Sequence, residues 1–552
     1  MKRRQFIRHI VNGTGSLTAG QFLTYFLHFG LPVNQRAFAM AEDKSREAED
    51  PHFLIYWFLE GGWMGYDMFN PVVTPNHVIE RDDNISEERY RVARFGEDGY
   101  GIYNKNGIRY GYLAKEGEDL FPDMAILSSM YTGSGHSSER LRCHMGSYRF
   151  RNTEERESDE RSVMQAFAEV YGQPYLLPHL SWHWWLSDGE LNEVQYTGRR
   201  GYYHALGPTH AHTIYAGTPD NLRDFLLRML RMSADPVNAQ IENFLTDIDS
   251  YLLDDNRAEV VRSYDSARAI YQNLVDRGRA LDQKSLNRLF NDNRLKEEFE
   301  IKPADELITY RSVNGNKART KFSPAVNVQA MMTYELMSKG YTCCSFIESR
   351  DIRRFDDHKS RERLWKPDGT PVGQNDTTEK MREDLWHPLK VFVHKLKNTE
   401  YRNTGKSLYD FTTIVLTSEF GRTIHGDVDR ILSRDIPETE KKKMIGDQDI
   451  SQHWPVTSCA FLGGRVKGYR QYGGAGEDTL MPIPILPDGS MDPAFDPVRG
   501  TELKDRTRNE KSFIPNHGDV YATALYLADI NPEGRGRNER PPLKFVKQGV
   551  NV

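Results

Sequence analysis

Short apolar runs recur along the chain, and the first of them, residues 53–59, contains no charged side chain. It stops at Glu60-Gly61-Gly62. A run of this kind is typical of a strand that is buried on both faces of a parallel sheet. Similar runs cover residues 124–130, 342–347, 411–417 and 458–462. The pattern therefore predicts a buried strand at each of these places.

Helical patterns separate these strands, at residues 162–171, 327–338, 378–396 and 519–528. Gly340 follows the second of them and precedes the strand at 342, as a C-cap glycine does. Strands that alternate with helices predict an α/β fold, here a doubly wound, mostly parallel sheet with helices on both faces. We expect this domain to cover residues 42–552.

The region from about residue 219 to residue 300 has a different pattern. Its segments 220–232, 236–253 and 257–281 have helical periodicity and many charges, and no strand signal interrupts them. We interpret residues 219–300 as a helical insertion in the α/β domain.

The first forty or so residues have the features of an export signal. Arg3-Arg4 is followed by a stretch without charged residues from Val11 to Gln35, and 37–41 offers two A-x-A cleavage sites. This pattern is typical of a twin-arginine signal peptide, here residues 1–41. It predicts a periplasmic or secreted protein whose first partner is the twin-arginine export machinery. The stretch is only mildly apolar, which argues against a permanent membrane span; an uncleaved membrane helix is the alternative.

Composition narrows the classes of partner. The formal net charge is −6, so the chain lacks the basic balance of a nucleic-acid-binding protein. Four cysteines in 552 residues do not make a disulfide framework. Cys343 and Cys344 are adjacent within an apolar run, and we expect them to be two buried thiols.

Candidate chemistry lies where the predicted strands end, because ligands of parallel sheets bind beyond the carboxyl ends of the strands. Asp67 follows the first strand, Asp356 and His358 follow the strand at 342–347, and Glu419 follows the strand at 411–417. His453 lies just before the last strand. Carboxylates mixed with imidazoles favour Zn²⁺ or Mn²⁺ over Mg²⁺ or Ca²⁺. We therefore predict a divalent metal site formed by these five residues, with Asp356, His358 and His453 as the first choice of ligands and Asp67 and Glu419 as the second.

Each residue also has an ordinary explanation. Asp67 could cap a turn, and Asp356 and His358 could lie in a charged surface loop. Glu419 could form an ion pair with Arg422, three residues later. The case for one shared site rests on the common placement of these residues beside buried strands.

Several motifs occur together in one order along the chain. They are Leu59-Glu60-Gly61-Gly62 with Asp67, Phe355-Asp356-Asp357-His358, Thr417-Ser418-Glu419-Phe420-Gly421-Arg422-Thr423, His453-Trp454-Pro455 and Leu462-Gly463-Gly464-Arg465. In these motifs the chain resembles a family of exported bacterial proteins with a twin-arginine signal. That family is a domain of unknown function related to the alkaline phosphatase–sulfatase superfamily. The resemblance covers nearly the whole of the expected mature chain.

The resemblance implies an alkaline-phosphatase-like α/β fold. By this analogy Asp67 is the first-strand metal ligand, and Asp356 and His358 are the central pair of ligands. Glu419 is the strand-end carboxylate, and His453 is a late histidine ligand.

The chain departs from the superfamily pattern in one place, which the resembled family shares, and from the family pattern in two. Phe420 stands where the superfamily usually has a histidine, Gln452 where the family commonly has an aspartate, and Met64 where a serine is frequent. The pattern also does not identify a nucleophile. Ser134 and Ser137 are the nearest hydroxyls, and a polar loop is the favoured explanation of both.

Three functions are consistent with these residues. The first is a metal-dependent, sulfatase-like hydrolase of phosphate or sulfate esters, in which Arg422 grips the anionic group of the substrate. The second is a non-catalytic protein that binds a small anionic ester or an anionic glycan on a degenerate alkaline-phosphatase-like fold. The third is an envelope-assembly component with the insertion at 219–300 as its contact surface.

Overall fold

The computed structural model describes about half of the chain, and all structural statements below refer to that part. The described residues are 51–63, 65–71, 102–135, 139, 142–144, 146, 162–172, 175–182, 213–215, 219–220, 222–224, 226–227, 283–306, 310–312, 319–321, 324–349, 355, 364–365, 371–372, 379–422, 437, 453–476, 481–495, 512–533 and 540–550. The expected signal peptide and most of the expected helical insertion lie outside them.

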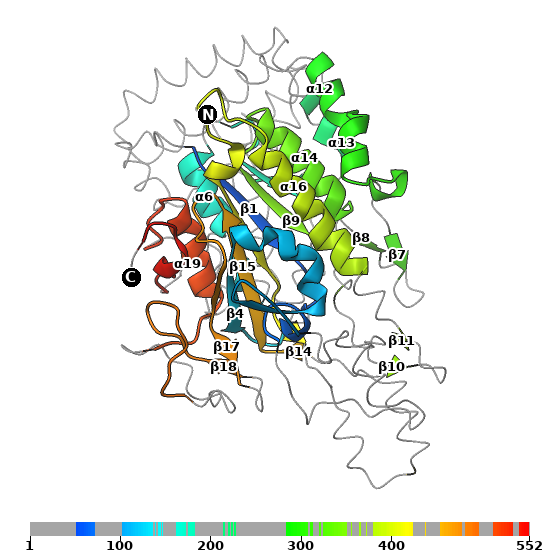
Figure 1. Cartoon of the computed structure of the whole chain (residues 1–552). Coiled ribbons are helices and arrows are strands. Elements are labelled where there is room, and N and C mark those ends of the chain that lie inside the picture. Colours follow the sequence, from blue (N-terminus) through cyan, green and yellow to red (C-terminus); the bar gives the residue numbers. More distant parts are fainter. Residues whose placement is uncertain are drawn as a thin grey trace, which may run out of the picture.

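A mixed sheet of eight strands forms the centre of the fold (Figure 1). Its order is β16 (Arg470–Tyr472), β4 (Met124–Tyr131), β15 (Val456–Gly463), β12 (Thr412–Thr417), β1 (Phe53–Phe58), β9 (Cys344–Glu348), β5 (His179–Ser181) and β6 (Thr213–Tyr215). β15 is antiparallel to both of its neighbours, and every other pairing in the sheet is parallel. Seven strands therefore run in one direction and β15 runs in the other.

The five apolar runs predicted as strands coincide with β1, β4, β9, β12 and β15. The prediction of an α/β fold with a mostly parallel sheet is confirmed. The reversed direction of β15 has no signature in the apolar pattern, because a strand buried on both faces looks the same in either direction.

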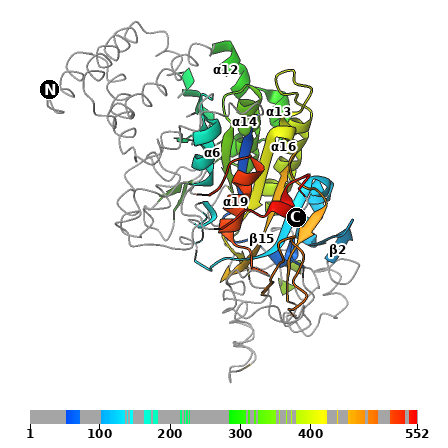
Figure 2. The ribbon, with the colours of Figure 1, turned by 90° about the vertical axis from the view of Figure 1, so that its left-hand side faces the viewer.

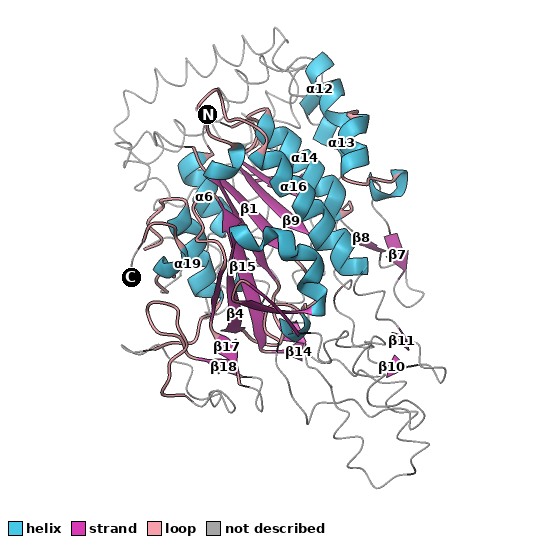
Figure 3. Cartoon of the chain, viewed as in Figure 1, coloured by secondary structure: helices cyan, strands magenta, loops and turns pink. Residues whose placement is uncertain are grey.

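Helices cover both faces of the sheet (Figures 2 and 3). On one face lie α14 (Val326–Ser338) and α16 (His387–Lys397), and on the other lie α6 (Val163–Tyr171) and α19 (His517–Leu527). In β9, the Ser345 hydroxyl is 2.9 Å from the Thr333 hydroxyl of α14, and the Cys344 thiol donates to the Met164 carbonyl of α6. Successive strand residues point to opposite faces, so these contacts place α14 and α6 on opposite sides.

The core includes all of β1, whose six residues are at most 1 % exposed. The Trp57 ring meets Phe392 of α16 edge-on at 6.2 Å, and its indole N–H donates to the Asp384 carbonyl at 3.0 Å. On the other face, the Tyr56 hydroxyl donates to the Cys143 carbonyl at 2.9 Å. Burying side chains of this size contributes about 1.5–3 kcal/mol each.

All four cysteines are buried and none forms a disulfide, as expected for the pair Cys343 and Cys344. Burial raises the pKa of the Cys344 thiol well above its ordinary value. Within the described residues, no helix is both long enough and apolar enough to cross a membrane.

Shorter elements surround the sheet. The strand pairs are β2 (Ile102–Lys105) with β3 (Ile108–Gly111), β7 (Tyr310–Ser312) with β8 (Arg319–Lys321), β10 (Leu364–Trp365) with β11 (Pro371–Val372), β13 (Gly421–Arg422) with β14 (His453–Trp454), and β17 (Gly474–Ala475) with β18 (Pro482–Ile483). The short helices are η1 (Gly65–Asp67), η3 (Tyr112–Asp123), η5 (Pro303–Glu306), η7 (Arg382–Trp386), η8 (Leu408–Phe411) and η9 (Lys544–Val546). Of these, η7 is a π-helix that leads into α16.

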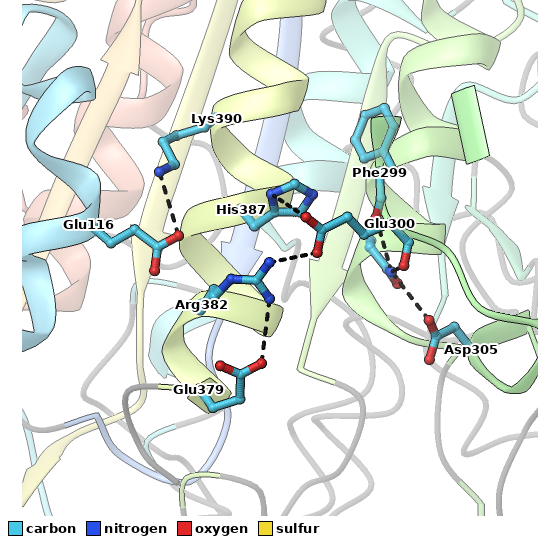
Figure 4. Close-up of polar contacts among 9 residues, drawn as sticks. Glu116, Phe299, Glu300, Asp305, Glu379, Arg382, His387 and Lys390 are labelled. Carbon is cyan, nitrogen blue, oxygen red and sulfur yellow. Dashed lines mark hydrogen bonds and ion pairs between the residues drawn. The ribbon is translucent and has the colours of Figure 1, made fainter. Parts of the chain in front are cut away.

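Two helices at the end of the expected insertion, α12 (Gln283–Phe290) and α13 (Asn293–Glu298), pack against α14. The chain then joins the core at Glu300, whose carboxylate lies 2.6 Å from the Arg382 guanidinium (Figure 4). Asn327 of α14 donates from its amide to the Glu300 carbonyl oxygen at 3.4 Å. These contacts attach the end of α13 to the helix layer.

Candidate functional site

The carboxyl edge of the sheet is assembled from β1, β12 and the start of β15. Because β15 runs against its neighbours, its first residues lie beside the last residues of β4, with Val456 opposite Tyr131. The chain before β15 therefore returns to the edge at which β1 and β12 end. His453 reaches this edge by the same reversal, in β14, where it pairs with Arg422 of β13.

Glu419 holds the loop that follows β1. Its carboxylate is fully buried and accepts a hydrogen bond from the Gly61 backbone N–H at 2.8 Å. The neighbouring Ser418 hydroxyl donates to the Leu59 carbonyl at 2.6 Å and accepts from the Trp63 backbone N–H at 3.2 Å. The residues after β12 thus bind the residues after β1 through backbone groups.

Arg422 completes this arrangement from the other side. Its side chain is 1 % exposed, and Nε donates to the Gly61 carbonyl at 3.0 Å and to the Gly62 carbonyl at 3.3 Å. Nη2 donates to the Gly61 carbonyl as well. We call Gly61, Gly62, Ser418, Glu419 and Arg422 the strand-end latch. In the latch the Arg422 guanidinium binds the protein's own backbone, and its predicted grip on a substrate anion stays a prediction.

The latch depends on glycine at position 62. Gly62 has φ of +85°, which side-chain-bearing residues rarely adopt. A Cβ atom there would also lie 2.5 Å from Cε2 of Phe420. Only glycine lets Phe420 and the loop after β1 approach this closely.

His517, the first residue of α19, forms a hydrogen bond with the latch. Its Nε2 lies 3.0 Å from the Glu419 carbonyl oxygen, which can only accept, so Nε2 donates. Cys143 lies 3.1 Å from the same nitrogen, and its thiol donates to the Ser418 carbonyl. Burial lowers the pKa of His517, which favours a neutral imidazole in the folded protein.

His453 is partly exposed, and its ring is held in place. Nδ1 lies 2.7 Å from the Ser134 carbonyl oxygen, and the ring stacks on Phe420 with centroids 4.3 Å apart and planes inclined by 30°. The carbonyl accepts, so Nδ1 carries a proton. This is the arrangement that metal-binding histidines commonly show.

Asp67 ends the short helix η1 at the same edge. The position that a Cβ atom of Gly65 would take is 3.9 Å from the Thr457 Cα, so η1 lies against the start of β15. Asp67 is 9 % exposed, and its carboxylate has no hydrogen-bond or ion-pair partner among the described residues. A carboxylate with unused acceptor positions can receive a cation or a hydrogen-bond donor.

The structure tests the five predicted metal ligands only in part. Asp356 and His358 lie outside the described residues. Among the residues that are described, no group of three or more His, Cys, Asp or Glu side chains is placed to hold a metal ion. Asp67, Glu419 and His453 therefore do not form a complete site by themselves, and the five-residue site stays a prediction.

Sequence reasoning missed the partners that organise this edge. His517 and Cys143 gave no signal, because neither belongs to a motif at a strand end. Phe420 gave one, because the superfamily that the chain resembles usually has a histidine at this place. Of the two hydroxyl candidates for a nucleophile, Ser134 contributes its backbone carbonyl to His453, and Ser137 lies outside the described residues.

Comparisons of the chain with models of protein families, with curated proteins and with solved structures found no match.

Proposed function

We propose that the chain is an exported, metal-dependent hydrolase of phosphate or sulfate esters, with its site at the carboxyl edge of the sheet. The observation that carries the proposal is Asp67. A carboxylate that is 9 % exposed and lacks a partner among the described residues fits a position beside a divalent cation.

The proposed cation, Zn²⁺ or Mn²⁺, would be held by Asp67, Asp356, His358 and His453. Such an ion polarises an ester and lowers the pKa of bound water when it is present. His453 would contribute Nε2, since its Nδ1 donates to the Ser134 carbonyl. Glu419 belongs to this set only if its carboxylate reaches the ion while it keeps the Gly61 N–H.

Metal analysis of the purified mature chain tests the cation site. We expect at least one Zn²⁺ or Mn²⁺ per chain, and loss of most of it in Asp67→Asn, because the amide has no charge to offset the cation. Activity is then screened with aryl phosphate mono- and diesters and aryl sulfates in the presence of Zn²⁺, Mn²⁺ or Mg²⁺. A wild-type chain without metal contradicts the proposal. Turnover that survives Asp356→Ala would place the site elsewhere.

The strand-end latch favours a second candidate, a non-catalytic protein that binds a small anionic ester or an anionic glycan. Arg422 and Glu419, which a hydrolase would use for substrate and metal, both bind backbone groups of the loop after β1. Metal that is bound in stoichiometric amount without turnover of any ester would favour this candidate.

Export rests on the twin-arginine pattern at Arg3 and Arg4. Replacement of both by lysine should leave the precursor in the cytoplasm, because the export machinery reads the arginine pair. Fractionation of cells that express the two forms measures this. Unchanged export of the lysine form by the general secretory route would contradict the twin-arginine assignment.

A further inference from the structure

The β2–β3 hairpin lies outside the eight-stranded sheet, and the side chain of Gln471 joins it to the edge strand β16. Gln471 Oε1 accepts a hydrogen bond from the Arg109 backbone N–H at 2.7 Å, and Nε2 donates to the Arg109 carbonyl at 2.7 Å. A neighbouring strand would exchange the same two hydrogen bonds with Arg109 through its backbone. The Gln471 amide therefore takes the place of a strand partner for the hairpin.

The same amide also reaches the chain that follows η1. Nε2 donates to the Phe69 carbonyl at 3.0 Å and lies 2.7 Å from the Ser128 hydroxyl oxygen of β4. The amide nitrogen is the atom that faces the carbonyls, because a carbonyl oxygen can only accept a hydrogen bond. With one planar group, Gln471 thus binds the hairpin, the sheet and the residue two positions after Asp67.

The hairpin in turn packs directly against the backbone of Asp67. The N–H of Gly111, at the end of β3, donates to the Met68 carbonyl at 2.6 Å. A Cβ atom on Gly111 would lie 2.4 Å from the Asp67 carbonyl carbon, so only glycine allows this approach. The position of Asp67 therefore depends on where the hairpin lies, and Gln471 fixes the hairpin.

We propose that Gln471 is a positioning residue for Asp67. By joining the hairpin and Phe69 to the sheet, it sets where the Asp67 carboxylate lies at the carboxyl edge. This carboxylate is 9 % exposed and makes no hydrogen bond among the described residues, so its place is determined by the backbone that carries it. The placement of Asp67 does not rest on the proposed function, whereas its effect on a bound cation does.

Two variants of Gln471 remove its donors. Gln471→Glu keeps the length of the side chain and the acceptor for the Arg109 N–H, but its carboxylate cannot donate to the Arg109 and Phe69 carbonyls. Gln471→Met, which has no amide, serves if the glutamate variant does not fold. Tyr472→Phe is the matched control, because it removes the donor to the Phe545 carbonyl from the next residue of the same strand. Successive strand residues point to opposite faces, so this loss lies away from the hairpin.

The first experiment measures amide hydrogen exchange in the metal-free mature protein. The Gly111 N–H reports the contact between the hairpin and the Asp67 turn, and the amides of β1 report opening of the whole sheet. In Gln471→Glu we expect Gly111 to exchange about 10-fold faster, beyond any change in β1, because two hydrogen bonds that hold the hairpin and Phe69 are lost. Tyr472→Phe should change the rates at Gly111 and at β1 by the same factor.

The second experiment measures Zn²⁺ affinity against a competing chelator. Gln471→Glu should bind Zn²⁺ about 10-fold more weakly, as expected when a group that orients a metal ligand is removed. Asp67→Asn should lose most of the affinity, which shows whether the titrated ion lies at Asp67. Tyr472→Phe should keep the wild-type affinity.

The outcomes separate this proposal from the proposed function. Gly111 exchange that accelerates in Gln471→Glu, in a protein that binds no Zn²⁺ or whose affinity Asp67→Asn leaves unchanged, supports the positioning role and contradicts the proposed cation site. Gly111 exchange that changes only as much as that of β1 overturns the positioning role. The role is equally overturned if Asp67→Asn loses Zn²⁺ while Gln471→Glu binds it as tightly as the wild type.

Discussion

A glutamate and an arginine occur close together in two regions of the molecule, one buried and one exposed to solvent. In the strand-end latch, Glu419 and Arg422 are at most 1 % exposed, and each binds backbone groups of the loop after β1. At the end of α13, the side chains of Glu300 and Arg382 are 49 % and 34 % exposed and bind each other at 2.6 Å. The same residue types thus determine backbone geometry in one place and form a solvated ion pair in the other.

The two regions differ in which polar groups would lose a hydrogen-bond partner if one of the charged side chains were removed. Water can replace either partner of the Glu300–Arg382 pair, so such pairs contribute about 0–1 kcal/mol. Water does not reach the latch, so loss of Arg422 there leaves the Gly61 and Gly62 carbonyls without this donor, and loss of Glu419 leaves the Gly61 N–H without this acceptor. We therefore expect sequence changes to be tolerated at the end of α13 and not at the end of β12.

The largest expected effect separates the two arginines. Arg422→Ala should lower the free energy of unfolding by about 3–5 kcal/mol, because it removes a buried charge and the donors of the Gly61 and Gly62 carbonyls. Arg382→Ala, the same change in the exposed pair, should lower it by less than about 1 kcal/mol. Urea unfolding of both variants measures the contrast. Equal losses would mean that burial does not distinguish the two regions.

The effect expected for Glu335 of α14 is intermediate in size. It is 8 % exposed, and its carboxylate has no hydrogen-bond partner among the described residues. Burial raises its pKa, so the folded protein favours the protonated form and loses stability as pH rises above the pKa of the unfolded chain. Glu335→Gln should therefore stabilise the protein at pH 7, by an amount on the order of 1 kcal/mol. Below a pH of about 4 the Glu335 carboxyl is mostly protonated in both the folded and the unfolded state. Unfolding measured there should therefore show no such gain in stability.

The smallest expected effect concerns the exposed pair. The hydrogen bond from Arg382 lowers the pKa of Glu300, so this group stabilises the fold above the unfolded pKa of glutamate and loses that contribution as pH falls through its folded pKa. Because Glu300 is half exposed, the contribution should be only a few tenths of a kcal/mol. Comparison of wild type with Glu300→Gln at pH 7 measures it. The difference should shrink in about 1 M salt, and a difference that salt leaves unchanged would contradict the solvated-pair description.

The strands of the sheet were the most predictable part of the fold. Residues 53–59 predict β1 because every side chain of this strand is buried, and burial on both faces leaves an uninterrupted apolar run. The three-residue strands β5, β6 and β16 are too short to produce such a run. The reversal of β15 also leaves no pattern, because the direction of a strand depends on the connection that precedes it.

The edge of the sheet at which Glu419 and Arg422 lie was predictable, and their partners there were not. Because Glu419 and Arg422 follow a buried strand, the sequence predicted that they lie at the carboxyl edge of the sheet, where the structure has them. Their partners are backbone atoms of Gly61 and Gly62, and no residue type marks a backbone carbonyl as an acceptor for a distant arginine. The roles of His517 and Phe420 likewise depend on which segments pack together across the sheet.

The pairing of Arg422 with His453 has a consequence for how the gene can be altered. The chain leaves the sheet edge at residue 422 and returns to it at residue 453, directly opposite in the β13–β14 pair. The β13–β14 pair holds these two points of the chain together, so it fixes the spacing between the end of β12 and the start of β15. The cost of closing a chain segment rises slowly with its length, by about 0.6 kcal/mol for each doubling. Insertion of residues between positions 422 and 453 should therefore leave the sheet intact for as long as this pair forms.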